Sequence, residues 1–238
     1  MILKVKNDLF DYPNRFIMQM KNGFKFSLDS LLLSEFVNLK KSDKFILDMC
    51  SGNAPVALVL SLKTNASIVC FEIQKQIANL AKESVSINNL NSHIKIINDD
   101  IKNIEKYYNI DTFDIITCNP PYFKVINNNS LNINDFLTLA RHEITIDLES
   151  IFNIAYKFLK DKAAFYLVHR SGRLDEIILY ASKYKLNVKK LQFITTKKGA
   201  RPSIVLVKCV KNSKYGIKVE KEICVDKLRT YQHLFEGR

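Results

Sequence analysis

The chain has 238 residues and a mass of 27.5 kDa, which fits one domain with a short extension. Hydrophobic residues make up 47% and charged residues 25%, a balance that excludes a collagen, a disordered tail protein and a coiled coil. The net charge of +12 is uneven: residues 1–156 sum to −1 (16 basic, 17 acidic) and residues 157–238 sum to +13 (20 basic, 7 acidic). The basic last third favours a polyanionic partner, with solvated lysines as the plainer interpretation.

Short apolar runs alternate with helical patterns along most of the chain. Strands are expected over residues 45–49, 67–72, 94–100, 113–118 and 164–169, and helices over residues 30–39, 55–62, 77–88, 148–159 and 174–184. Residues 188–195 and 203–210, joined by a short basic turn, predict an antiparallel hairpin. This alternation favours an α/β fold with a largely parallel sheet. We expect a main domain over residues 26–212, an N-terminal extension (1–25), and a basic tail (213–238) that packs on the domain or is partly mobile.

Acidic side chains end three of the expected strands. Asp48 ends the first, Glu72 the second, and Asp99 and Asp100 the third. In parallel sheets, ligands bind outside the carboxyl ends of the strands. Asp48 would suit an ammonium group, Glu72 both hydroxyls of a ribose, and one of the last two an adenine amino group. Each acid alone is compatible with a solvated strand end, but together they outline a pocket for a nucleoside with a cationic tail.

A turn of small residues follows the first expected strand. Ser51, Gly52 and Asn53 lead into a helix with Pro55 in its first turn. Such a turn lets the backbone approach a ligand closely and points helix N–H groups at it. The turn holds a single glycine, so an ordinary structural connection explains it equally well.

Asn119-Pro120-Pro121-Tyr122 directly follows the fourth expected strand. The prolines fix φ and remove N–H donors, so the backbone carbonyls point outward without ladder partners. The Asn119 amide oxygen and the Pro120 carbonyl then form a pair of acceptors that suits an exocyclic NH₂ group. Holding both hydrogens turns the nitrogen lone pair towards an electrophile. Tyr122 would offer a flat surface for stacking a base.

These residues resemble class I S-adenosylmethionine-dependent methyltransferases that act on amino groups. Four stretches extend the resemblance to the bacterial tRNA adenine-37 N6-methyltransferase family, which modifies valine tRNA beside its anticodon: residues 26–33, 118–124, 140–143 and 168–174. The resemblance covers the chain from about residue 10 to residue 210. It implies a Rossmann-like sandwich with a mostly parallel seven-stranded sheet and a C-terminal antiparallel hairpin.

The resemblance also implies roles for single residues. The catalytic set would be Asn119, Pro120, Pro121 and Tyr122. S-adenosylmethionine would be bound by Asp29, Asp48, Ser51, Gly52, Glu72, Ile73, Asp100, Ile101 and Asn119. The anticodon stem-loop of a tRNA would be contacted by Tyr122, Arg141, Lys197, Lys198 and Arg201. The sequence departs from the family at Ala54, where a second glycine is common; an alanine there is tolerated if its φ is negative.

Other activities share the Asn-Pro-Pro-Tyr motif. They are methylation of guanine N2 in rRNA, of adenine N6 in DNA, and of glutamine in release factors. The basic last third favours a nucleic acid over a release factor. A non-catalytic RNA-binding module on the same fold would predict loss of the acids or of Asn119, and all are present.

The cysteine, histidine and hydropathy patterns argue against several further classes of protein. The five cysteines include no C-x-x-C pair and the four histidines are scattered, so we expect neither a disulfide scaffold nor a metal site. Cys118 could suggest a nucleophile for cytosine C5 chemistry, but a buried strand cysteine is the favoured interpretation. Lys4 and Lys6 interrupt any signal-peptide core. We expect a cytoplasmic protein without a membrane segment, and a monomer is favoured.

Overall fold

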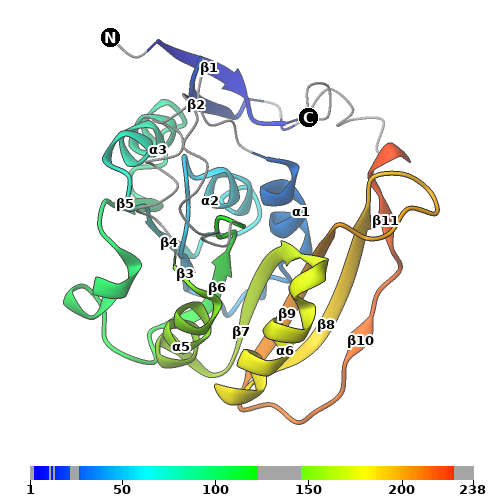
Figure 1. Cartoon of the computed structure of the whole chain (residues 1–238). Helices are drawn as coiled ribbons and strands as arrows, with labels where there is room; N and C mark the ends of the chain where they lie inside the picture. The colour runs from blue at the N-terminus through cyan, green and yellow to red at the C-terminus, as the bar shows by residue number, and fades with distance from the viewer. Residues whose placement is uncertain (1–2, 11, 13, 22–26, 123–145, 228–238) are drawn as a thin grey trace, which may run out of the picture.

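The computed structural model describes residues 3–10, 12, 14–21, 27–122 and 146–227. Within these ranges the chain forms one nine-stranded mixed sheet with helices on both faces, and a separate two-stranded sheet near the N-terminus (Figure 1). None of the helices in these ranges is long and apolar enough to cross a membrane.

Five parallel strands form the centre of the large sheet, in the spatial order β5-β4-β3-β6-β7. Their bounds are Phe45–Asp48 (β3), Ser67–Phe71 (β4), Ile94–Ile97 (β5), Phe113–Cys118 (β6) and Leu159–Arg170 (β7). Ile46 and Leu47 are adjacent in β3 and both are fully buried, so both faces of the sheet are covered there. This burial explains why the strands read as continuous apolar runs.

The C-terminal hairpin completes the sheet. β9 (Ile204–Lys211) lies between β7 and β8 (Leu186–Thr195) and runs antiparallel to both. Two short strands, β10 (Lys218–Val219) and β11 (Ile223–Cys224), pair in parallel with β8. The predicted α/β sandwich with a mostly parallel sheet and an antiparallel hairpin is therefore confirmed, and the two short strands extend its outer edge.

Helices cover the sheet in two layers, each with its own apolar core (Figure 1). One layer holds α1 (Leu28–Phe36), α2 (Pro55–Leu60) and α3 (Lys75–Ile87). The other holds α5 (Leu148–Phe158), α6 (Leu174–Lys183) and the 3₁₀ turn η1 (Ile101–Lys106). The start of α5 is fixed by Asp147, whose carboxylate accepts a hydrogen bond of 2.7 Å from the Ser150 amide.

An N-terminal hairpin, which the sequence patterns did not indicate, packs on α3. Its strands are β1 (Lys4–Asp8) and β2 (Phe16–Met20). The Ser84 hydroxyl of α3 accepts from the Met18 amide at 2.9 Å, and the Asn88 carboxamide oxygen accepts from the Phe16 amide at 3.0 Å. These side chains take the place of a third strand along β2. The division of the chain at residues 26 and 212 stays a prediction.

An alanine at position 54 is expected to be tolerated if its φ is negative, and in the turn between β3 and α2 this φ is positive. Ala54 has a φ of +69° and a ψ of 35°, in the left-handed region that disfavours side chains with a Cβ. Its side chain is fully buried in the core beneath α1 and α2, so its Cβ packs against apolar neighbours. The preceding Asn53 fixes the turn to the N-terminal hairpin, because its side-chain NH₂ donates to the Met18 carbonyl at 2.9 Å.

Replacing Ala54 with glycine tests this backbone strain against a matched variant, Ala57→Gly. Both alanines are fully buried and lie at or within α2, so each variant loses one buried methyl group. Glycine at position 54 relieves a left-handed conformation, whereas glycine at position 57 loosens a helix. We expect Ala54→Gly to be more stable than Ala57→Gly by about 1–2 kcal/mol in urea denaturation. Equal stabilities would show that Ala54 carries no strain.

Candidate active site

The predicted site residues gather at the carboxyl edge of the central strands. The described part of this edge is formed by the ends of β3, β4, β5 and β6 and by the first turn of α1. Parallel strands bring their carboxyl ends to one edge, so residues far apart in sequence meet there. Asp48 ends β3, Glu72 and Asn119 directly follow β4 and β6, and Asp100 lies three residues beyond the end of β5.

Asp48 is fully buried at the end of β3. Its Oδ1 accepts a hydrogen bond of 2.8 Å from the Thr117 hydroxyl of β6, while its Oδ2 is buried without a partner in the described part of the chain. Burial raises the pKa of Asp48 to about 7; the Thr117 hydrogen bond opposes this shift and the charge of Glu72 adds to it. A buried carboxylate oxygen without a donor is costly, and a cationic ligand group would satisfy it.

Glu72 holds two turns together at the end of β4. One carboxylate oxygen accepts from the Gly52 amide and the other from the Gln74 amide, both at 2.9 Å. Burial raises the pKa of Glu72, and these two hydrogen bonds oppose the shift. A carboxylate has about four lone-pair positions, so two acceptor positions remain for a diol. The neighbouring Ile73 is 38% exposed, which leaves an apolar surface beside this carboxylate.

The two acids after β5 have different surroundings. Both oxygens of Asp99 are occupied, one by Asn103 and one by the Tyr107 hydroxyl, each at 2.8 Å. Asp100 begins η1, and its Oδ1 accepts from the Lys102 amide at 2.9 Å. Among the described residues its Oδ2 has no partner, so Asp100 is the acid that keeps a free acceptor. Ile101 is buried beside it, with 5% of its surface exposed.

The Asn119 side chain is held on both sides. Its Nδ2 donates to the Ser30 hydroxyl at 2.9 Å, and its Oδ1 accepts from the Tyr122 hydroxyl, also at 2.9 Å. The Tyr122 hydroxyl lies 3.0 Å from an oxygen of Asp29 as well, and its single proton is available to one acceptor at a time. The structure thus places the Asp29 carboxylate within hydrogen-bond distance of the last residue of the Asn-Pro-Pro-Tyr segment.

Tyr122 has a different setting from the free stacking surface that the sequence suggested. Its ring meets His169 edge-on with centroids 5.2 Å apart, and the Arg170 guanidinium lies 5.2 Å from its centroid. Burial, together with the charge and hydrogen bond of Asp29, raises the pKa of Tyr122 well above its usual value, so its hydroxyl stays protonated. One face of the ring is therefore already in contact with a cation.

Sequence reasoning gave no role to Ser30 or to His169, although both touch this network. Ser30 lies in the first turn of α1, and its contact with Asn119 appears only in the folded chain. His169 is 1% exposed, and burial lowers its pKa to about 4, with the charge of Arg173 acting in the same direction. Its Nδ1 accepts from the Arg170 amide at 2.9 Å. The sequence signal that could have indicated a role for His169 is its position at the end of the strand predicted over residues 164–169.

Cys118 has the properties of a structural cysteine. It is fully buried at the end of β6, and its sulfur lies 3.9 Å from that of Cys50. Burial, assisted by the neighbouring thiol, raises the pKa of Cys118 well above its usual value. The thiol form is a poor nucleophile, which argues against cytosine C5 chemistry.

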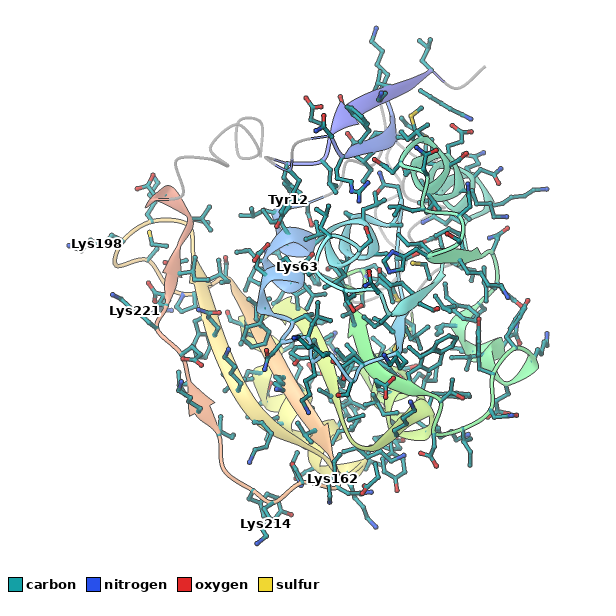
Figure 2. The ribbon with its side chains drawn as sticks, turned by 180° about the vertical axis from the view of Figure 1, so that it is seen from behind. Tyr12, Lys63, Lys162, Lys198, Lys214 and Lys221 are labelled. Atoms are coloured by element: carbon teal, nitrogen blue, oxygen red, sulfur yellow. The ribbon has the colours of Figure 1, made fainter. Side chains whose placement is uncertain are left out.

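The predicted RNA-contacting residues fall partly within the described chain. Lys197, Lys198 and Arg201 lie on the connection between β8 and β9, and Figure 2 shows Lys198 at its outer margin. Because β8 runs parallel to β7, this connection lies at the same edge of the sheet as the candidate site. The Ser171 amide after β7 donates to the Ser203 carbonyl at 3.1 Å and ties the two together. Arg141 lies outside the described residues.

Curated relatives match the chain over most of its length. A protein of Bacteroides thetaiotaomicron named tRNA1(Val) (adenine(37)-N6)-methyltransferase is 29% identical over 217 residues, covering 90% of this chain and 88% of its own. A protein of Porphyromonas gingivalis with the same name is 27% identical, covering 84% of this chain and 79% of its own. The resemblance seen in the sequence is therefore confirmed.

Solved structures with the same fold include methyltransferases. A predicted O-methyltransferase from Agrobacterium tumefaciens superposes with a TM-score of 0.66 at 16% identity, covering 83% of this chain and 88% of its own. A SAM-dependent O-methyltransferase from Thermotoga maritima gives a TM-score of 0.54 at 13% identity, covering 82% and 69%. The family model of the methyltransferase small domain matches residues 27–174. The chain belongs to the methyltransferase small domain family.

Proposed function

We propose that this protein is a tRNA adenine N6-methyltransferase that transfers a methyl group from S-adenosylmethionine to the exocyclic amine of adenine-37, beside the anticodon of a valine-type tRNA. The observation that carries the proposal is the fixed Asn119 amide at the end of β6, next to strand ends whose acids suit a nucleoside with a cationic tail. The near-full-length relatives bearing that name support the choice of base and of RNA.

The residues at the ends of β3 to β5 fit the methyl donor. Asp48 offers its unpartnered Oδ2 to the ammonium group of the methionine part, beside the Ser51–Gly52 turn. Glu72 has lone pairs left for the two ribose hydroxyls. Asp100 offers Oδ2 to the adenine amino group, and Ile73 and Ile101 supply apolar surface for the ring. When bound, S-adenosylmethionine supplies the methyl group as an electrophile.

The Asn-Pro-Pro-Tyr segment holds the nucleophile. Asn119 Oδ1 and the Pro120 carbonyl accept the two hydrogens of the target amine, which turns its lone pair out of conjugation with the ring. To bind there, the amine takes the place of the Tyr122 hydroxyl on Asn119. The Tyr122 proton then goes to Asp29 alone, so the hydroxyl keeps a partner throughout. Catalysis rests on positioning, since the amine acquires positive charge before it loses a proton.

The basic residues at the same edge face the RNA. The target base is extracted from the anticodon loop at a cost of a few kcal/mol. Positive charge beside the site comes from Arg170, Lys197, Lys198 and Arg201. These side chains would contact the phosphates beside the extracted base. Arg170 also contacts the ring of Tyr122, so it links the phosphate side to the base side.

The reaction itself is tested by incubating a valine tRNA transcript with the protein and isotopically labelled S-adenosylmethionine, and then analysing nucleosides by mass spectrometry. We expect N6-methyladenosine, located at position 37 by fragment mapping. Asn119→Ala should reduce the rate by at least about a hundredfold, as loss of a key polar contact does. Its affinity for the methyl donor should stay within a few-fold. Labelled N2-methylguanosine, or a variant of near-full activity, would contradict the proposal.

Ser30→Ala removes the acceptor that orients the Asn119 amide. We expect kcat to fall by about fivefold with an unchanged KM for S-adenosylmethionine, because a neutral hydrogen bond is worth about 1 kcal/mol. Ser30→Thr, which keeps the hydroxyl, should restore most of kcat. Ser34→Ala is the matched control, since Ser34 is buried in the same helix and its hydroxyl bonds the Ser30 carbonyl instead. Equal losses in the two alanine variants would reduce Ser30 to a structural role.

The raised pKa of Asp48 predicts pH-dependent binding of the methyl donor. Below about pH 7 the free protein holds Asp48 protonated, whereas an ammonium group binds the ionised carboxylate. Affinity should therefore rise with pH between about 5.5 and 7, by up to about tenfold per pH unit. Calorimetry should show a flat profile for Asp48→Asn and for adenosine, which lacks the cationic tail. A pH dependence that survives in Asp48→Asn would mean that another group titrates.

A further inference from the structure

Most of the basic residues of the last third that the structure describes are engaged within the fold. Carboxylates pair with several of them, namely Lys183 with Glu149, Arg173 with Glu176, and Lys211 with Asp111. The ammonium group of Lys189 lies on backbone carbonyls, those of Lys214 and Tyr215. Such contacts neutralise or fix part of the positive charge within the fold. Lys208 differs from the paired residues, because it lies on one face of the hairpin with no carboxylate partner in the described chain.

Lys208 lies in a row of lysines across three neighbouring strands. The register aligns Lys218 of β10 with Lys190 of β8, and Lys190 with Lys208 of β9. Residues directly opposite each other share a face of the sheet, and like charges in that relation destabilise it. Glu220 lies 3.4 Å from Lys190 and 3.1 Å from Lys218. In the described chain no carboxylate lies within ion-pair distance of Lys208.

The row lies on the face of the sheet beside α1. The Lys208 ammonium group lies 5.5 Å from the centre of the Tyr166 ring, and that of Lys190 lies 4.8 Å from the centre of Phe36 in α1. α6 packs on the opposite face of β8, so it does not cover the row. Figure 2 shows this face of β8 and β9 next to α1, with Lys198, Lys214 and Lys221 around its margin.

The electrostatic surroundings of Lys208 are mainly positive. Burial lowers the pKa of Lys208, the charges of Lys40 and Lys190 act in the same direction, and the charge of Asp43 opposes the shift. The nearby Asp43 uses one carboxylate oxygen to accept from the Lys40 amide at 2.7 Å, so that oxygen serves the turn. Glu220 lies near Lys190 and the charge of Asp43 acts on Lys208, but the two half-buried lysines still lie next to each other over aromatic rings. An anion there would relieve their repulsion.

We propose that Lys190 and Lys208, here called the lysine face, bind the sugar–phosphate backbone of the RNA substrate at a distance from the target base. This inference rests on the proposed function and extends it from the site to a second contact region. Tyr166 precedes Arg170 by four residues along β7, which puts the lysine face about 13 Å from the edge that holds the site. A stem-loop that inserts one base at that edge can lay neighbouring phosphates across the hairpin.

The test compares two double variants of equal charge change. Lys190→Gln with Lys208→Gln alters the lysine face, whereas Lys82→Gln with Lys95→Gln alters exposed lysines of α3 and β5, at the opposite edge of the sheet. Binding of a valine tRNA transcript is measured by filter binding over a series of salt concentrations. The first variant should bind about tenfold or more weakly, with a salt slope reduced by about 2, one unit per lost phosphate contact. The control should keep the wild-type slope.

Further readouts make the outcome decisive. An unchanged melting temperature and an unchanged affinity for S-adenosylmethionine identify a folded variant, and single Lys208→Gln should give about half the change in slope. If the lysine-face and control variants have equal slopes, the proposal is wrong. Loss of binding to anionic lipid vesicles with unchanged tRNA binding would also overturn it. The assay requires no methyl transfer, so a wild-type protein that binds tRNA without methylating it would refute the proposed function separately.

Discussion

The Asn119 amide ties the end of the central strand β6 to the first turn of α1, because its nitrogen donates to Ser30 and its oxygen accepts from Tyr122. A side-chain amide has a donor end and an acceptor end, and only the acceptor end can receive an amine hydrogen. With the donor end bound to Ser30, the oxygen is the end left to accept a hydrogen, as the proposed hold on the target amine requires. The position of α1 on the sheet therefore fixes which end of the Asn119 amide can accept.

The candidate site contains two features that lower the stability of the folded chain. Asp48 is buried with one unpartnered oxygen, and Ala54 has a left-handed backbone. A buried carboxyl group can reduce its desolvation cost by holding a proton, which agrees with its pKa near 7. A ligand that brings positive charge would replace that proton. The empty acceptor and the nearby turn are thus best understood as features shaped by a ligand rather than by folding alone.

The sequence predicted the parts of the site that depend on topology. Once parallel strands are inferred, the residues that end them must meet at one edge, so Asp48, Glu72 and Asp100 could be grouped without a structure. The sequence did not predict contacts that depend on packing. Ser30 meets Asn119 across 89 positions, and no local pattern encodes this contact. Likewise, no local pattern indicates the contact between Asp29 and Tyr122, and the assignment of Asp29 to the methyl donor stays a prediction.

Local patterns also explain the missed N-terminal hairpin. The outer strand β1 is largely exposed and lacks the clean alternation of a half-buried strand. The inner strand β2 forms its outer hydrogen bonds with side chains of α3, which a strand pattern does not reveal. The φ of Ala54 was likewise hidden, because alanine is a common helix residue and gives no sign of a left-handed turn.

The placing of β9 between β7 and β8 has a consequence for the order in which the protein assembles. β8 is made before β9, yet its neighbours in the large sheet are β9 and the short strands that follow it. During synthesis the strands from β3 to β7 can therefore pair first. Residues 186–195 have no neighbouring strand until β9 is synthesised. The strands that end at the proposed donor site can thus pair during translation, whereas the lysine face forms only once β9 has been made.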